Sequence, residues 1–342
     1  MNPVTCWVLN HPAHLQLLSG FIRGGNDNDL LIITQRPEID FMLSSKEVSN
    51  HLPKREIVRV PRLAGENVGI LKKIIRAFVR KNIVNKAFKS RVKDSKYRIE
   101  RIVSIGAPIE LRVGRKRKID QRWYVSDTEP NIIAHKLGMC CATDILLPHH
   151  WDEENDGGWL KKVLKKRIRV HHYHGVHGHV HLSKIDNSPT NLYDKKKLLV
   201  RKIIGDGIHD HNEILNFDDS LIKGDFEIEF QNEIDPEKAK WNLPNELIKY
   251  DGVLTQSVTL ATESTIQGIP TLLISKAKRG FLKYLNSEYT NFYRMSEIDP
   301  LIVKEWSDSI FSSEKLGAES ISWPSTRMRW VELLGPWKET LD

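Results

Sequence analysis

The sequence predicts an α/β protein of two domains, each built on a mostly parallel β-sheet. Three observations carry this prediction. The chain has 342 residues, which suits two domains of roughly 100–200 residues better than one. Its composition, 40% hydrophobic and 28% charged, is that of a globular protein. Short apolar runs alternate along it with longer amphipathic runs, as strands and helices do in an α/β fold.

The short runs of the first half are apolar or β-branched and are bounded by polar or turn residues, as buried strands are. We expect strands at 4–10, 30–34, 57–60, 102–105, 123–125 and 145–147. The runs between them repeat apolar residues every three or four positions, which predicts helices at 15–23, 68–88 and 131–137. Because strands and helices alternate, we expect a parallel sheet with both faces covered.

The pattern changes between 151 and 181, where an acidic, glycine-rich stretch and a basic stretch precede six histidines at 171–181. Strands are expected again at 198–204, 226–230, 252–255 and 271–275, and a last helix at 328–337. The sequence thus predicts a Rossmann-like domain at 1–165, a linker region at 166–195, a second Rossmann-like domain at 196–315 and a helical tail at 316–342. Two such domains are expected to face each other across a cleft at the carboxyl ends of their strands, where α/β sheets bind ligands.

Several protein classes do not fit the composition. No run of about 18 apolar residues is present, so we expect no membrane span. The first residues do not form a basic and then apolar segment, so we expect no secretory signal. The three cysteines, Cys6, Cys140 and Cys141, cannot form a disulfide framework and lack metal-ligand spacing, so we expect a cytoplasmic protein.

Positive charge is concentrated in one expected helix. The whole chain has a net charge of +8, yet the segment from Lys72 to Arg101 contains twelve basic residues and only two acidic ones. Such a segment attracts nucleic acid, an anionic membrane surface or a phosphorylated substrate, although a solvated helix face explains it equally well. Few aromatic residues are interleaved with the cations, which does not favour nucleic acid. We expect Lys72, Arg76 and Arg80 to bind an anionic acceptor, for instance a lipid phosphate at the inner membrane face.

The strongest motif is the segment 257–270, which follows an expected strand and opens a helix near Thr259. The amides at a helix N-terminus suit a diphosphate, and Glu263, about one turn further, could accept both hydroxyls of a ribose. The alternative is an ordinary capped helix in which Ser257 or Thr259 caps and Glu263 is solvated.

Three other segments that follow expected strands carry candidate residues. His14 could take a proton from a hydroxyl, or it could cap a helix or hydrogen-bond in the core. Asp127 is a candidate base that could equally cap the next helix. Arg201 could bind phosphate or form a structural ion pair, and His209-Asp210 after the same strand is a candidate binding element.

The pattern Ser-x-Thr-Leu-x-x-Glu-x-x-x-x-Gly-x-Pro at 257–270 resembles the donor-nucleotide motif of GT-B glycosyltransferases. Further short stretches agree in order, from about residue 7 to about residue 295, with an uncharacterised archaeal and bacterial family of predicted GT-B glycosyltransferases. That family is related in fold to the non-hydrolysing UDP-N-acetylglucosamine (UDP-GlcNAc) 2-epimerases. The matching stretches are His11-Pro12-Ala13-His14, Ser104–Pro108, Asp127-Thr128-Glu129, Tyr173-His174-Gly175, Arg201 with His209-Asp210, Leu243–Leu247 and Gly280-Phe281-Leu282. The chain departs from the family at His177-Gly178, where relatives have Lys-Glu.

The resemblance implies a GT-B fold whose second domain holds a nucleoside-diphosphate sugar. Ser257 and Thr259 would then contact the diphosphate, Glu263 the ribose and Arg201 the leaving phosphate, with His209 and Asp210 beside them. The first domain would bind the acceptor, with His14 and Asp127 as catalytic residues and His11 as a further acceptor contact. Positive charge and a helix dipole would stabilise the departing diphosphate without a metal or other cofactor.

The histidine run at 171–181 has three interpretations, a metal site and two alternatives to it. On a strand, the alternating His177, His179 and His181 would share one face, but only one acidic residue is close in sequence, so we expect no metal site. Phosphate or partner recognition and a solvent-exposed linker are the alternatives. The Asp27-Asn28-Asp29 sequence is explained by turn chemistry and is not expected to bind a metal.

The sequence therefore predicts a glycosyltransferase of glycoconjugate synthesis that uses a nucleotide sugar and an unidentified acceptor, phosphorylated or lipid-linked. One alternative is an enzyme that epimerises the donor sugar at C2, like the UDP-GlcNAc 2-epimerases. The other is a catalytically inactive protein that binds nucleotides or nucleic acid.

Overall fold

The structure is a computed structural model. It describes residues 2–46, 48, 52–63, 69–93, 97–183, 195–203, 215, 217–222, 224–232, 241–312 and 323–339. The chain folds as two compact units, one of Met1–His177 with Ser325–Asp342 and one of Gly178–Pro324. Both are α/β units, as the sequence predicts.

The first unit is built on a parallel sheet that has seven strands within the described residues, in the order β3-β2-β1-β4-β5-β6-β7. The strands are β1 (Asn2–Leu9), β2 (Leu30–Thr34), β3 (Glu56–Val60), β4 (Tyr97–Ile105), β5 (Gln121–Val125), β6 (Asp144–Pro148) and β7 (Arg169–Tyr173). The strands β2 and β3 lie on one side of β1, and the strands from β4 to β7 follow on its other side. Ligands of open parallel sheets bind at the carboxyl ends of the strands where the order reverses, and in this sheet the reversal lies between β1 and β4.

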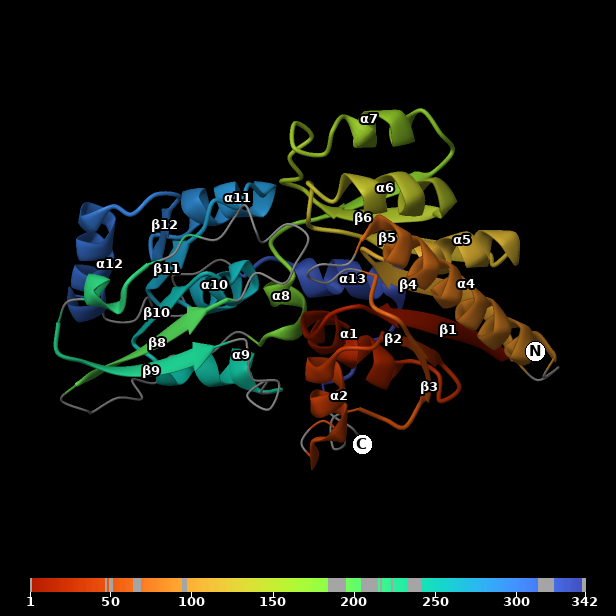
Figure 1. The fold of residues 1–342 in the computed structure, drawn as a ribbon, viewed down its shortest axis with the longest axis horizontal. Coiled ribbons are helices and arrows are strands. Elements are labelled where there is room, and N and C mark those ends of the chain that lie inside the picture. The colour runs from red at the N-terminus through yellow and green to blue at the C-terminus, as the bar shows by residue number, and fades with distance from the viewer. Residues whose placement is uncertain are drawn as a thin grey trace. The chain divides into compact units, whose positions relative to one another are not determined.

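Helices cover both faces of this sheet (Figure 1). One layer contains α4 (Ile70–Lys93), α5 (Pro108–Lys116) and α6 (Ile132–Gly138), followed by the short helices η1 (Met139–Cys141) and α7 (Trp159–Leu164). The other contains α1 (Pro12–Gly24), α2 (Pro37–Ser44) and α13 (Thr326–Leu334). The sheet core is apolar because β1, β2 and β6 are buried along most of their length, as strands between two helical layers must be.

The second unit is built on a parallel sheet of five described strands in the order β12-β11-β10-β8-β9. The strands are β8 (Lys196–Lys202), β9 (Phe226–Asn232), β10 (Gly252–Thr255), β11 (Thr271–Ile274) and β12 (Phe292–Met295). The described helices are α8 (Gly178–His181), η3 (Asp219–Leu221), α9 (Leu243–Glu246), η5 (Leu247–Lys249), α10 (Val258–Ile266), α11 (Gly280–Glu288) and α12 (Pro300–Ser312).

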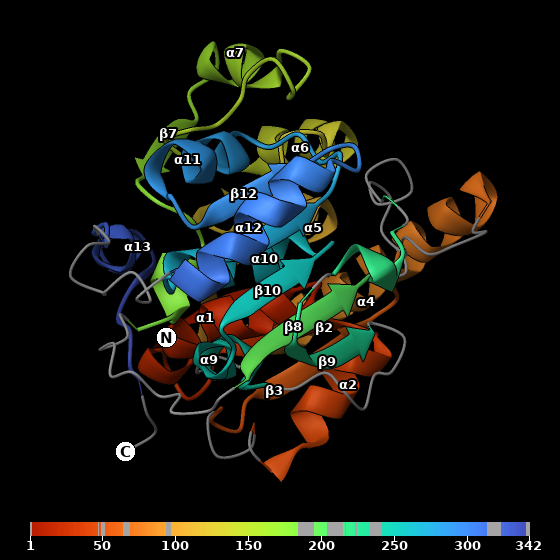
Figure 2. The ribbon, with the colours of Figure 1, turned by 90° about the vertical axis from the view of Figure 1, so that its left-hand side faces the viewer.

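Alternate residues of each strand in this unit enter different cores, as the pleat of a strand requires. Leu198 and Val200 pack with Trp306 of α12, which lies across one face of the sheet in Figure 2. Leu199 points to the other face and packs with Leu260 of α10. The point where strand order reverses in this sheet lies between β8 and β10.

The structure divides the chain differently from the expected boundaries. The expected linker at 166–195 contains β7, which pairs with β6 from Asp144↔Arg169 to Pro148↔Tyr173, so the first unit continues to His177. The tail is part of the first unit, where Trp330 of α13 packs against Phe21. The polar composition of Arg169–Tyr173 explains why its strand was not predicted.

Candidate functional site

Two polar side chains from different strand ends meet in the first unit. Asp127 follows β5 and His177 lies four residues after β7, and Nδ1 of His177 is 2.9 Å from Oδ2 of Asp127. The other carboxylate oxygen of Asp127 accepts a hydrogen bond from the Thr128 hydroxyl. Helix α6 begins at Ile132 with Asn131 at its N-cap, so Asp127 pairs with His177 and is not the residue at that helix start.

Aromatic rings hold the His177 imidazole in place. It stacks on the Tyr173 ring, with centroids 5.8 Å apart, and meets the edge of Trp330 of α13 at 5.4 Å. Tyr173 and Trp330 are themselves buried and in contact. A ring fixed on two sides, with one nitrogen on a carboxylate, has a defined orientation for its other nitrogen.

The contact with His177 lowers the pKa of Asp127. Burial alone would raise the pKa of this carboxyl group, but its interactions with His177, Thr128 and His14 outweigh burial and lower the pKa below its usual range. Asp127 is therefore ionised at neutral pH, and it can stabilise an imidazolium that forms on His177.

His14 has a different electrostatic setting from the one a general base needs. Burial lowers its pKa to about 3, and the positive charges of His177 and Arg36 add to this effect, while Asp127 opposes it. Its Nδ1 accepts a hydrogen bond from the backbone N–H of Asn10 at 3.3 Å, which puts the proton of the neutral ring on Nε2. His14 is thus a neutral hydrogen-bond donor at pH 7 and a weak proton acceptor.

The neighbouring His11 has a structural role at the same turn. It is the N-cap residue of α1, where its Nδ1 accepts a hydrogen bond from the N–H of Ala13, and Pro12 occupies the first helical position.

In the second unit, α10 is fixed at both ends. Ser257 is its N-cap and its hydroxyl accepts a hydrogen bond from the N–H of Leu260, while Thr259 is exposed in the first turn. At the other end Gly268 has a φ of +80°, and the N–H groups of Gly268 and Ile269 donate to the carbonyls of Thr265 and Ser264. This pattern ends a helix and favours glycine at the left-handed position, which explains the Gly in the Gly-x-Pro of the motif.

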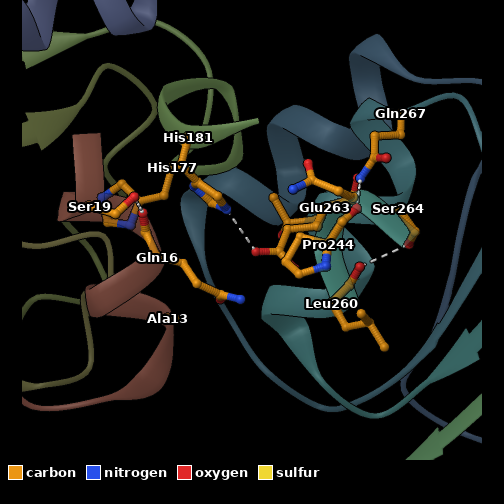
Figure 3. Close-up of polar contacts among 12 residues, drawn as sticks. Ala13, Gln16, Ser19, His177, His181, Pro244, Leu260, Glu263, Ser264 and Gln267 are labelled. Carbon is orange, nitrogen blue, oxygen red and sulfur yellow. Dashed lines mark hydrogen bonds and ion pairs between the residues drawn. The ribbon is translucent and has the colours of Figure 1, made fainter. Parts of the chain in front are cut away.

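Glu263 of α10 is buried, with 4% of its surface exposed, and faces the short helix α8. Its Oε1 lies 3.1 Å from Nε2 of His181, and Figure 3 shows the two side chains pointing toward each other. The close approach of α8 to α10 depends on Gly178, because a Cβ there would lie 2.5 Å from Cδ1 of Ile266. Beside this pair, Nε2 of Gln267 donates to the carbonyls of Pro244 and Glu263 and fixes the helix to α9.

Arg201 lies at the carboxyl end of β8, at the reversal of strand order. In the sheet it stands opposite Thr255, the last residue of β10, and its carbonyl accepts a hydrogen bond from the N–H of Gln256. Ser257, two residues after Thr255, is the N-cap of α10. The half-buried Arg201 and the N-terminus of α10 therefore both adjoin the carboxyl ends of β8 and β10. The other residues expected here, His209 and Asp210, lie outside the described residues.

Arg80 is not on the exposed face of its helix, contrary to expectation. It is 3% exposed, its Nε donates to the buried carboxylate of Glu110 at 2.6 Å, and its other nitrogens bond Thr34 and Asn10. This network engages the Arg80 guanidinium inside the first unit. Lys72 is exposed and Arg76 is half-buried on the same helix.

The alternating histidines do not share one face of a strand. The segment turns into the helix α8, and each ring finds a different partner: His177 bonds Asp127, His179 bonds the Tyr289 hydroxyl, and His181 bonds Glu263. Across the described ranges, no group of three or more His, Cys, Asp or Glu side chains is arranged to hold a metal ion. Asp29 of the Asp-x-Asp sequence is buried and bonds the N–H of Thr5 and the Trp7 indole.

Comparison with known proteins shows a shared fold without detectable sequence similarity. No protein-family model matches the sequence, and no curated protein sequence matches it. The putative UDP-GlcNAc 2-epimerase of Listeria monocytogenes superposes with a TM-score of 0.62 at 10% identity, over 96% of this chain and 93% of that one.

Two further solved structures superpose over nearly the whole chain. The UDP-GlcNAc 2-epimerase of Methanocaldococcus jannaschii, in complex with UDP-GlcNAc and UDP, gives a TM-score of 0.60 at 11% identity over 97% and 99% of the two chains. The glycotransferase of kitacinnamycin gives a TM-score of 0.53 at 10% identity over 97% and 96%. The fold is that of the UDP-GlcNAc 2-epimerases and GT-B glycosyltransferases. The fold class and the predicted relation in fold to these epimerases are confirmed.

Sequence reasoning missed His177 and His181 as site residues. Both belong to the histidine-rich run of the expected linker region, and their partners, Asp127 and Glu263, lie 50 and 82 positions away along the chain. The one available signal was the departure from the family pattern at His177-Gly178, where the histidine meets Asp127 and the glycine permits the packing of α8.

Proposed function

We propose that the protein is a glycosyltransferase whose second unit binds a UDP-sugar and whose first unit binds the acceptor. The observation that supports the nucleotide part is that Arg201 and the N-terminus of α10 adjoin the strand-order reversal of the second sheet, with the buried Glu263 further along the same helix. An arginine and helix amides bind phosphate, and a carboxylate accepts hydrogen bonds from ribose hydroxyls. A solved structure with the same fold contains UDP-GlcNAc and UDP.

In this proposal Ser257 and Thr259 present the first turn of α10 to the diphosphate, and Glu263 binds the ribose. The His181 imidazole covers the Glu263 carboxylate, since their side chains are only 10% and 6% exposed. We therefore propose that the ribose hydroxyls displace His181 from Glu263. Arg201 and the helix N-terminus would then stabilise the negative charge of the leaving diphosphate without a metal ion.

The Asp127–His177 pair supports transfer to a hydroxyl acceptor. His177 would accept the proton of the acceptor hydroxyl as that oxygen bonds to the anomeric carbon of the sugar, and the bond from this carbon to the diphosphate would break. Asp127 would stabilise the resulting imidazolium, and the neutral His14 would donate a hydrogen bond through Nε2. Lys72 and Arg76 would attract an acceptor that carries negative charge.

A thermal-shift panel of nucleoside diphosphates and their sugars tests the donor site. UDP at about 100 times its dissociation constant should stabilise the protein by about 2.7 kcal/mol. Glu263→Ala removes hydrogen bonds to ribose and should weaken UDP binding at least about tenfold. His181→Ala, which uncovers the carboxylate, should bind UDP at least as tightly as the unaltered protein. Equal UDP affinity in the protein and in Glu263→Ala would contradict the proposed donor site.

The fold shared with two 2-epimerases favours C2 epimerisation of the donor as the second candidate. Incubation of UDP-GlcNAc with the protein alone separates the two, because an epimerase inverts C2 without an acceptor. We expect no C2 inversion, and we expect Asp127→Asn and His177→Gln to abolish transfer to a supplied acceptor while the thermal shift with UDP remains. Transfer should persist in EDTA. Acceptor-free inversion at C2 would make the protein an epimerase.

A further inference from the structure

The first ten residues of α4 present an apolar stripe to solvent. Leu71 is 72% exposed and Phe78 is 61% exposed, and the rest of the stripe is also open: Ile74, Ile75 and Val79. Residues three, four and seven positions apart lie on one side of a helix, so these side chains form a continuous strip about 12 Å long.

Residues beyond the stripe hold the helix to its unit. The helix is anchored further along by Arg80, Val84 and Phe88, which are spaced four residues apart and buried on one side, with Val84 and Phe88 in the sheet core. The exposed apolar residues at 71–79 precede this anchor, and exposed large apolar side chains in one cluster mark an interaction surface.

Cations surround the stripe and no acid accompanies them. The sequence of α4 contains nine basic residues and no aspartate or glutamate: Lys72, Lys73, Arg76, Arg80, Lys81, Lys86, Lys89, Arg91 and Lys93. Lys72 and Lys81 are exposed on opposite flanks of the stripe, about 180° apart around the helix, and Lys81 lies over the Phe78 ring. Lys86 and Lys89 are exposed further along.

We infer that α4 docks the protein on an anionic lipid surface, with Leu71, Ile74, Ile75 and Phe78 at the acyl boundary and the flanking lysines at the headgroups. A helix with an apolar face bordered by lysines lies in the plane of a membrane interface, and anionic lipid adds to its binding. A second copy of the chain is a poor occupant, because a symmetric contact through this helix would bring together the lysines that border the two stripes. Nucleic acid is also a poor occupant, because the centre of the surface is apolar and the cations lie at its edges.

Vesicle flotation tests this surface. The protein should float with vesicles in which about one lipid in three is anionic phosphatidylglycerol, and not with phosphatidylcholine alone, and high salt should weaken the binding. Ile74→Ser/Phe78→Ser and Lys72→Glu/Lys81→Glu should each reduce the bound fraction at least about tenfold. The matched control Ile133→Ser/Leu301→Ser alters exposed apolar residues of α6 and α12 and should bind like the unaltered protein.

Each contrary result overturns the inference. Absence of binding to anionic vesicles, or equal binding by the α4 variants, removes the lipid surface. A lower molar mass of the α4 variants in light scattering, without vesicle binding, assigns the stripe to a second copy, and RNA binding without vesicle binding assigns the helix to nucleic acid. The UDP thermal shift of Ile74→Ser/Phe78→Ser reports on the second unit alone, so a failure of this inference is separable from a failure of the donor site.

Discussion

Individual histidines give the protein a pH dependence that can be assigned. Burial lowers the pKa of His14 to about 3 and that of His150 to about 4, from an ordinary value of 6.5. The folded chain resists protonation of these rings and the unfolded chain does not. The stability that the two neutral rings contribute is therefore fully present above pH 6.5, and it is lost as the pH falls toward the folded pKa values. The thermal midpoint should therefore fall between pH 7 and pH 5.

Replacement of these rings isolates their contribution. His14→Gln and His150→Gln should each make the thermal midpoint less dependent on pH between 7 and 5. The carboxyl groups with lowered pKa, Asp127 and Asp144, act in the same direction but only below their ordinary value of 3.8, so they do not obscure this window. A variant with the same loss of midpoint as the unaltered protein would show that its histidine is not buried in a neutral state.

At the residue scale the sequence predicts positions and not partners. A residue that follows a buried strand must lie at the carboxyl edge of the sheet, so His14, Asp127 and Arg201 could be placed there without a structure. The sequence does not say which charged groups meet across the sheet. Asp127 bonds His177 and Glu263 bonds His181, while the guanidinium of Arg80, part of a basic helix, is buried against Glu110.

At the scale of elements, the glycine that ends α10 determines how this helix enters β11. Gly268 has a φ of +80°, which any side chain with a Cβ adopts at a cost of roughly 1–2 kcal/mol. Gly268→Ala should lower the free energy of unfolding of the second unit by about this amount in urea denaturation. Gly69→Ala is the matched control, because Gly69 has no positive φ and an added Cβ would have no atom within 4 Å. A similar loss in both variants would contradict the role of backbone conformation at Gly268.

Buried apolar strands were predictable, and strands of polar composition were not. The strands β1, β2, β10 and β11 are short, apolar runs because both of their faces are covered, and each appears at its predicted place within a few residues. At the edges of the two sheets, β7 and β12 carry arginine, histidine and tyrosine, which weakens the apolar signal. These segments are strands because they pair with a neighbouring strand, and such pairing cannot be predicted from their local composition.

For the whole molecule, the return of the chain end to the first unit could not be predicted. The last described residues pack on α1: the Trp337 ring contacts Phe21 edge-on at 5.0 Å, and the N–H of Lys338 donates to the carbonyl of Gly20. Sequence periodicity shows that 328–337 is amphipathic, but it does not identify the surface that its apolar side meets. The two-domain α/β organisation follows from length and alternation, and the path of the tail follows from packing alone.

Gly20 leaves space for the Trp337 ring. The effect of Gly20→Ala on the free energy of unfolding should therefore change sign when this ring is removed. An added Cβ would lie 2.3 Å from the Trp337 ring, so Gly20→Ala should displace the ring and destabilise the first unit by about 1–3 kcal/mol in urea denaturation. In a Trp337→Ala background the collision is absent, and alanine within α1 should instead stabilise by up to about 1 kcal/mol, since alanine forms helix better than glycine. The two substitutions are therefore expected to be strongly non-additive. Additive effects would mean that Trp337 does not rest on Gly20 in solution and that the tail is held to the first unit by α13 alone.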